Sequence, residues 1–86
     1  MPVLARFHGI VIRMFRLRGM PACFQAIYRD TELVVEIAPL RVVQGNVPGC
    51  VTELVLSWAQ YHQEELLAAW QAMLAGRRPT AIAPLG

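Results

Sequence analysis

Alternating hydrophobic and polar residues dominate the first half of the chain and predict a β-sheet. In several segments apolar side chains recur at every second position, and β-branched and aromatic residues are frequent there. This period is typical of strands that bury one face of a sheet. The expected strands lie at residues 3–7, 9–16, 22–28, 32–37 and 40–44. We therefore expect a small antiparallel sheet of three to five strands between about residues 2 and 44.

The hairpin formed by residues 22–37 has the clearest pattern. A polar turn at residues 29–31 separates two extended segments. On the first segment Phe24, Ala26 and Tyr28 share one side, and on the second segment Leu33, Val35 and Ile37 share one side. These apolar sides should face the same core, because opposite positions of paired strands lie on the same face of a sheet. Cys23 falls on the other face.

The period changes after residue 46 and predicts two helices. Apolar residues then recur three and four positions apart, first over about 47–60 and again over about 63–75. We expect Asn46 to cap the first helix, a junction near His62, and Gly76 to end the second helix. The chain is thus expected to be a single α+β domain, residues 1–86, with two C-terminal helices packed on one face of the sheet and a tail at 77–86.

Composition adds an expectation about association. Hydrophobic residues make up 56% of the 86 residues and charged residues only 16%. A chain this short has a large surface for its volume, so part of the apolar content is expected at a contact surface. We expect a homo-oligomer or a cognate protein partner. No segment resembles a membrane span or a signal peptide, so we expect a cytoplasmic protein that does not enter a membrane.

Charge is distributed unevenly along the chain. Residues 1–29 hold five arginines and no acid, whereas the rest holds three arginines and six acids. Arg13, Arg16 and Arg18, with Phe15 between them, could contact phosphates and bases, so a nucleic-acid-binding role is the alternative to a protein partner. The sequence pI of 8.9 is borderline for such a role, and a solvated strand face is the competing explanation.

The residues able to carry chemistry are few and form no motif. His8, His62, Cys23 and Cys50 have no metal-ligand spacing, so we expect neither a metal nor a cofactor. We interpret both cysteines as small buried hydrophobic residues. The alternative for Cys23 is an exposed, reactive thiol near Arg16, because it lies on the face opposite to Phe24.

Two further features of the helices have structural explanations. Glu64 and Glu65 suit the first turn of a helix and do not form an acid–base pair, since adjacent helical positions point in different directions. Bulky aromatic residues on apolar stripes are expected to be core or interface anchors; these are Phe24, Trp58 and Trp70.

Three blocks of sequence, in this order, resemble the small bacterial family known as Domain of Unknown Function 4160. They are the opening Met1-Pro2 with Arg6-Phe7 and Gly9 to Met14, the block Trp58-Ala59-x-x-His62-x-Glu64-Glu65-Leu66-Leu67-x-x-Trp70, and the closing Ile82-Ala83-Pro84-Leu85. The resemblance implies a histidine-rich segment after the second strand, but Gly19, Cys23 and Gln25 stand where the imidazoles would be. It also implies an association with toxin–antitoxin modules. We therefore expect a non-enzymatic protein-interaction module, with a degenerate nuclease-like or nucleic-acid-binding protein as the alternative.

Overall fold

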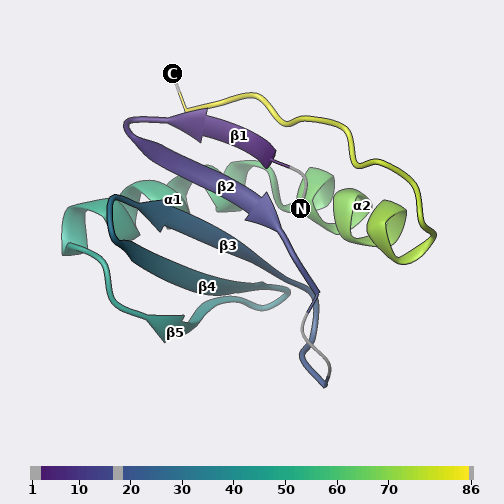
Figure 1. The fold of residues 1–86 in the computed structure, drawn as a ribbon, viewed down its shortest axis with the longest axis horizontal. Coiled ribbons are helices and arrows are strands. Elements are labelled where there is room, and N and C mark those ends of the chain that lie inside the picture. The colour runs from purple at the N-terminus through teal and green to yellow at the C-terminus, as the bar shows by residue number, and fades with distance from the viewer. Residues whose placement is uncertain (1–2, 17–18, 86) are drawn as a thin grey trace.

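The computed structural model describes residues 3–16 and 19–85 and contains a five-stranded antiparallel sheet followed by two helices (Figure 1). The strands are β1 (Val3–Phe7), β2 (Ile10–Met14), β3 (Cys23–Tyr28), β4 (Thr31–Ile37) and β5 (Leu40–Gly45), and the helices are α1 (Gly49–Tyr61) and α2 (Gln63–Leu74). The strands pair in chain order, β1-β2-β3-β4-β5. The predicted α+β fold is confirmed, with five strands.

The sheet buries one face against the helices, as the alternation predicts. Opposite positions on β3 and β4 pair in register, with Phe24 opposite Val35 and Ala26 opposite Leu33. These side chains join the main core together with apolar residues of the other strands and of both helices. Its largest fully buried members include Trp58, Phe24, Leu4, Ile10, Ile12, Met14, Leu33, Ile37 and Leu66.

Two backbone features shape the β1–β2 turn and the pairing of β5 with β4. His8 and Gly9 both adopt positive φ angles, 50° and 76°, which lets a two-residue turn join β1 to β2. At the end of β5, Gly45 has a φ of 105°, and a Cβ there would lie 2.3 Å from the carbonyl oxygen of Glu32. β5 can therefore approach β4 only with glycine at this position.

The first helix begins later than the sequence predicts. Asn46 was expected to cap it, but the N-cap residue is Pro48, whose carbonyl accepts hydrogen bonds from the N–H groups of Val51 and Thr52 at 2.9 and 3.1 Å. Val47 is buried, so the chain stays extended until it has placed this side chain in the core. The Asn46 prediction is wrong for this reason.

The junction between the helices and the end of α2 follow the sequence closely. His62 leaves the helical conformation, and its N–H still bonds to the carbonyls of Trp58 and Ala59. At the end of α2, the N–H groups of Gly76 and Arg77 bond to the carbonyls of Met73 and Ala72, the pattern of a glycine-terminated helix. Within the described residues, neither helix has the length and hydrophobicity needed to cross a bilayer.

The C-terminal segment returns along β1 and contributes to the core (Figure 1). The N–H of Ile82 donates to the carbonyl of Leu4 at 2.8 Å, and the indole Nε1–H of Trp58 donates to the carbonyl of Ala83 at 2.8 Å. Ile82 is buried. This segment therefore covers part of the β1 edge and satisfies a polar group of the largest core side chain.

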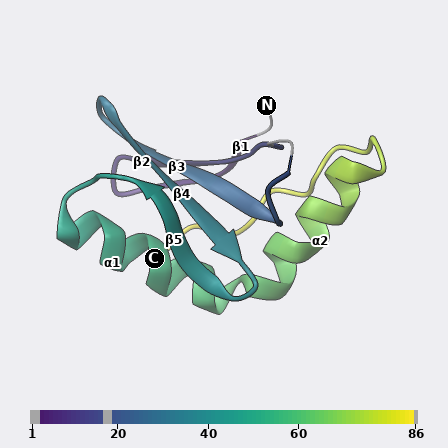
Figure 2. The same ribbon diagram turned by 90° about the horizontal axis from the view of Figure 1, so that it is seen from below.

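Both helices lie on the same side of the sheet (Figure 2). No other helix or strand of the described chain covers the opposite side, where a small second cluster packs at one end. Its buried members are Phe15, Cys23 and Val34, with Met20 and Val43 partly buried against them. We call the uncovered side of the sheet the open face.

Candidate interaction surface

The open face is formed by the strand positions that alternate with the core positions. The strand register arranges its side chains in two rows across β1, β2, β3 and β4. The first row contains Arg6, Val11, Ile27 and Glu32. The second row contains Val3, Arg13, Gln25 and Val34.

The centre of the first row is apolar. Val11 and Ile27 are directly paired and only partly buried, although both project away from the main core. Val3, in the second row, is 38% exposed. β-Branched residues stabilise strands, but a fully solvated face normally carries polar residues at such positions. Val3, Val11 and Ile27 therefore give the open face the composition of a surface that contacts another molecule.

The polar residues of the open face have opposite charges at opposite sides. Arg6 on β1 is exposed, and Glu32 on β4 is exposed. The Gln25 side-chain amide nitrogen donates to the carboxylate of Glu32, which leaves the amide oxygen of Gln25 as a further acceptor. Because the strand order is β1-β2-β3-β4, a positive charge and a negative charge stand at the two ends of one row.

Arg13 has an unpaired donor in the middle of the second row. Its Nε is shielded from solvent and has no hydrogen-bond partner in the structure. A buried donor without an acceptor costs about 1 to 3 kcal/mol relative to a paired one. Because this atom is shielded within the described chain, an acceptor on another molecule could reach it only if the Arg13 side chain moved.

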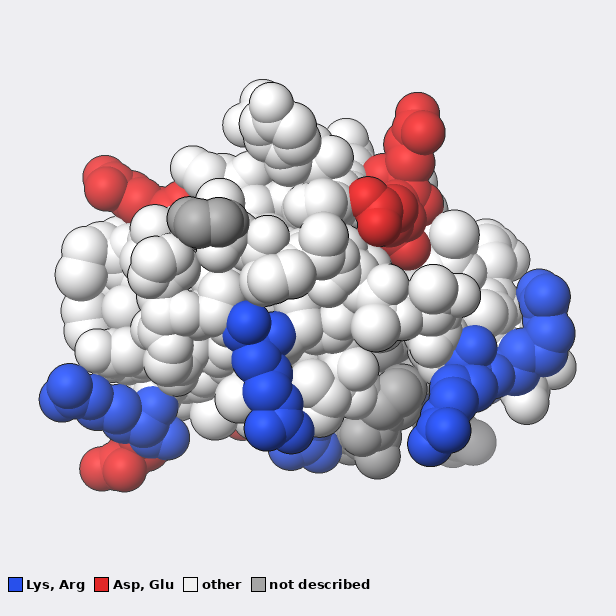
Figure 3. All heavy atoms as spheres, turned by 90° about the horizontal axis from the view of Figure 1, so that it is seen from above, with Lys and Arg blue, Asp and Glu red and all other residues white. Residues whose placement is uncertain are grey.

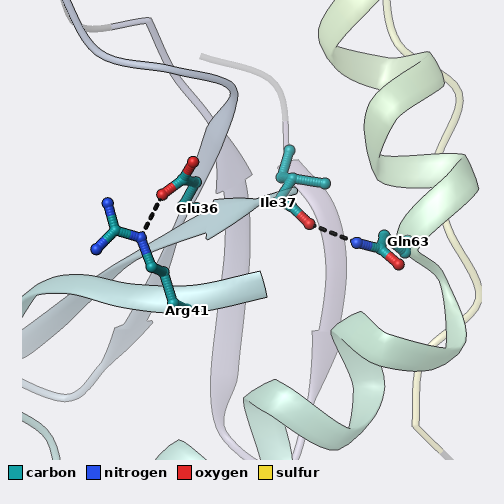
Figure 4. A network of polar contacts seen from close by, with 4 residues as sticks. All are labelled: Glu36, Ile37, Arg41 and Gln63. Carbon is teal, nitrogen blue, oxygen red and sulfur yellow. Dashed lines mark hydrogen bonds and ion pairs between the residues drawn. The ribbon is translucent and has the colours of Figure 1, made fainter. Parts of the chain in front are cut away.

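At the β5 side of the sheet, Glu36 is already paired. Its Oε1 lies 2.6 Å from Nε of Arg41, and Glu36 is only 6% exposed (Figure 4). Nearby, the side-chain amide of Gln63 donates to the carbonyl of Ile37 at 2.7 Å and ties the start of α2 to the end of β4. These contacts fix the β4–β5 hairpin.

The two cysteines differ in accessibility. Cys23 is fully buried in the second cluster, so the exposed-thiol alternative is wrong. Burial, and secondly the charge of Glu36, raise the pKa of the Cys23 thiol, so it stays protonated at neutral pH and is a poor nucleophile. Cys50 is exposed in the first turn of α1, and its predicted burial is wrong because it lies one helical position away from the buried stripe that begins at Val51.

The arginines singled out from the sequence do not form a single described cluster. Arg13 lies on the open face and Arg16 is exposed after β2, whereas Arg18 lies outside the described residues. Figure 3 looks onto the β1 edge and shows the basic side chains in separate groups, with most acidic side chains towards the helical layer. A continuous basic strip is not visible from this side.

The two histidines lie in two separate connections of the chain. His8 is in the β1–β2 turn, and Nδ1 of His62 lies 2.6 Å from Oε1 of Glu65 while its ring packs 5.4 Å from the Trp58 ring. The described residues contain no group of three or more His, Cys, Asp or Glu side chains placed to hold a metal ion. Glu64 and Glu65 lie in the first turn of α2.

The aromatic anchors lie in the core. Phe24 and Trp58 are fully buried, with ring centroids 6.0 Å apart in an edge-on arrangement, and Trp70 is 8% exposed. They position the helices on the sheet and contribute nothing to the open face. Of the residues that form it, Arg13 was singled out from the sequence as a possible contact and Gln25 as standing where an imidazole is implied, whereas Val11, Ile27 and Glu32 were not. Their signal was the presence of valine and isoleucine at period-two positions opposite the core.

Comparison with known proteins identifies the family of the chain. No curated protein and no solved structure matches the chain. The family model described as Domain of unknown function (DUF4160) matches residues 9–71, which include the strands from β2 onward and most of both helices. The chain belongs to this family.

Proposed function

We propose that the chain is a cytoplasmic protein-interaction module that binds its partner through the open face. One observation carries the proposal: the helices cover one side of the sheet only, and the other side presents the paired Val11 and Ile27 between charges of opposite sign. An apolar centre with a polar rim is the usual composition of a protein–protein interface. The toxin–antitoxin association implied by the family resemblance would supply such a partner.

A nucleic-acid partner is the second candidate, and the arginines favour it. Arg6 and Arg13 on the open face and Arg16 beside it could neutralise phosphates. Glu32 lies on the same face and would repel the phosphate backbone. The mixture of charges fits a protein surface better than a polyanion.

Catalysis has little support on this face. Positions 23 and 25, where the resemblance implies imidazoles, both project to the open side, but Cys23 is buried with a raised pKa and Gln25 is engaged by Glu32. Neither side chain supplies a base or an activated nucleophile at neutral pH. Binding is therefore the role that we propose.

The test uses the affinity-tagged chain at native expression level in its host. Native mass spectrometry should find the wild-type chain in a complex, and Val11→Glu and Ile27→Glu should release it as a monomer with the mass of the tag added to 9.6 kDa. Gln60→Glu and Gln71→Glu add the same charge at exposed helical positions and should leave the complex intact. A monomeric wild-type chain, or equal loss with the helical variants, would refute the proposal.

A further inference from the structure

We infer that the partner of the open face is a second copy of this chain, packed sheet to sheet about a two-fold axis that runs parallel to the strands between β2 and β3. The inference rests on the proposed function and specifies its partner. It follows from the order of side chains along the two rows.

The first row is complementary to itself under this rotation. The axis reverses the strand order, so β1 of one copy faces β4 of the other and β2 faces β3. Arg6 then lies opposite Glu32 of the second copy at both ends of the row. Val11 lies opposite Ile27, so the centre of the contact is apolar.

The second row is also matched. Arg13 of one copy faces Gln25 of the other, whose amide oxygen is left free by the bond from its nitrogen to Glu32. The Arg13 guanidinium, which has several donors, is thus placed opposite an acceptor in the dimer. Val3 faces the position of Val34, which is already buried in the second cluster and adds little to the contact.

The geometry tolerates the twist of the sheets. Stacked sheets lie about 10 Å apart with strand directions rotated by about 30°. The ends of a four-strand row lie about 7 Å from the axis, so such a rotation displaces them by about 4 Å. Arginine and glutamate side chains are long enough to meet across that displacement.

The other two-fold arrangement is disfavoured. An axis perpendicular to the strands would keep the strand order and exchange the two rows, so Arg6 would face Val3 and Glu32 would face Val34. Val11 would face Arg13. Each of these contacts removes a charged group from water without giving it a partner. The row pattern therefore selects the axis parallel to the strands.

Charge-reversal variants test this arrangement by light scattering of the purified chain over about 1 to 100 μM, a range suited to a small interface. The wild-type chain should reach twice the 9.6 kDa monomer mass. Arg6→Glu and Glu32→Arg should each weaken dimerisation by at least about tenfold, because both ends of the contact become repulsive. Their equimolar mixture, and the double variant carrying both changes, should restore the dimer.

Charge reversals away from the open face serve as matched controls for these variants. Glu64→Arg and Arg77→Glu reverse exposed charges away from the open face and should leave the dimer unchanged. Circular dichroism should show that all variants fold, since Arg6 and Glu32 are exposed. If the wild-type chain is a dimer but the mixture of the Arg6→Glu and Glu32→Arg variants is not, the proposed two-fold axis is wrong. A monomeric wild-type chain would overturn the second copy as partner, while a complex with another protein that Val11→Glu disrupts would leave the proposed function standing.

Discussion

Replacement of Gly45 by alanine should destabilise the protein far more than replacement of any other described glycine. Its φ of 105° is unfavourable for a residue with a Cβ, and that Cβ would lie 2.3 Å from the Glu32 carbonyl oxygen and 2.9 Å from Cα of Leu33. Both neighbours are backbone atoms of a central strand, so they cannot rotate away. Relief of the contact requires β5 to move from β4.

The magnitude follows from two contributions. Forcing an L-residue into the left-handed region costs about 1 to 2 kcal/mol. Overpacking against a rigid environment adds about 1 to 3 kcal/mol. We therefore expect Gly45→Ala to lower the free energy of unfolding by about 3 kcal/mol, which for a domain of this size corresponds to a fall in Tm of about 10 to 25 °C.

Two other glycines separate these contributions. Gly76 has a φ of 74° with open space around its Cβ position, so Gly76→Ala should cost only about 1 kcal/mol. Gly49, in the first turn of α1, has open space and needs no positive φ, so Gly49→Ala should be neutral or stabilising by up to about 1 kcal/mol. Urea unfolding followed by tryptophan fluorescence, at one protein concentration, measures all three. Equal losses for Gly45→Ala and Gly76→Ala would show that the backbone contact at β5 is absent.

Three further predictions concern the C-terminal segment and the cysteines. Ile82→Ala should lower the free energy of unfolding by about 2 to 4 kcal/mol in the same urea assay, because Ile82 is buried; a loss below about 0.5 kcal/mol would mean that the segment does not pack on β1. A thiol reagent should modify Cys50 rapidly and Cys23 only after unfolding, and Cys50→Ser should remove the fast phase; a persisting fast phase would show that Cys23 is accessible. Because burial raises the pKa of the folded Cys23 thiol above its ordinary value, the unfolded chain loses this proton first as pH rises, so stability should fall above about pH 9. Cys23→Ala should reduce that fall, and an unchanged pH profile would contradict the raised pKa.

The fold was largely predictable because apolar residues recur at regular intervals in its strands and helices. The alternation at Phe24, Ala26, Leu33 and Val35 identified one buried face, and the register brings these residues together. The change of period after residue 46 identified both helices. Gly76 ended the second helix as expected, because an αL residue satisfies the last carbonyls.

What the sequence left open depends on contacts between distant segments. The burial of Cys23 requires Phe15 and Val34 to cover the open side of β3, and no local pattern reports this. The start of α1 depends on burial of Val47 in the core, which outweighs the capping preference of Asn46. The return of Ile82 to β1 likewise depends on a hydrogen bond to Leu4, far away in the sequence.

The strand order converts the uneven charge along the chain into a charge difference across the sheet. Residues 1–29 carry five of the eight arginines and no acid, and the acids begin at Asp30. In a meander, chain order becomes spatial order, so the basic segment supplies β1 and β2 and the acidic segment supplies β4. A row with a cation at one end and an anion at the other cannot match a uniformly charged polymer, but it matches its own reverse. This gradient of charge therefore favours a second copy with reversed strand order over a polyanion as the partner of the open face.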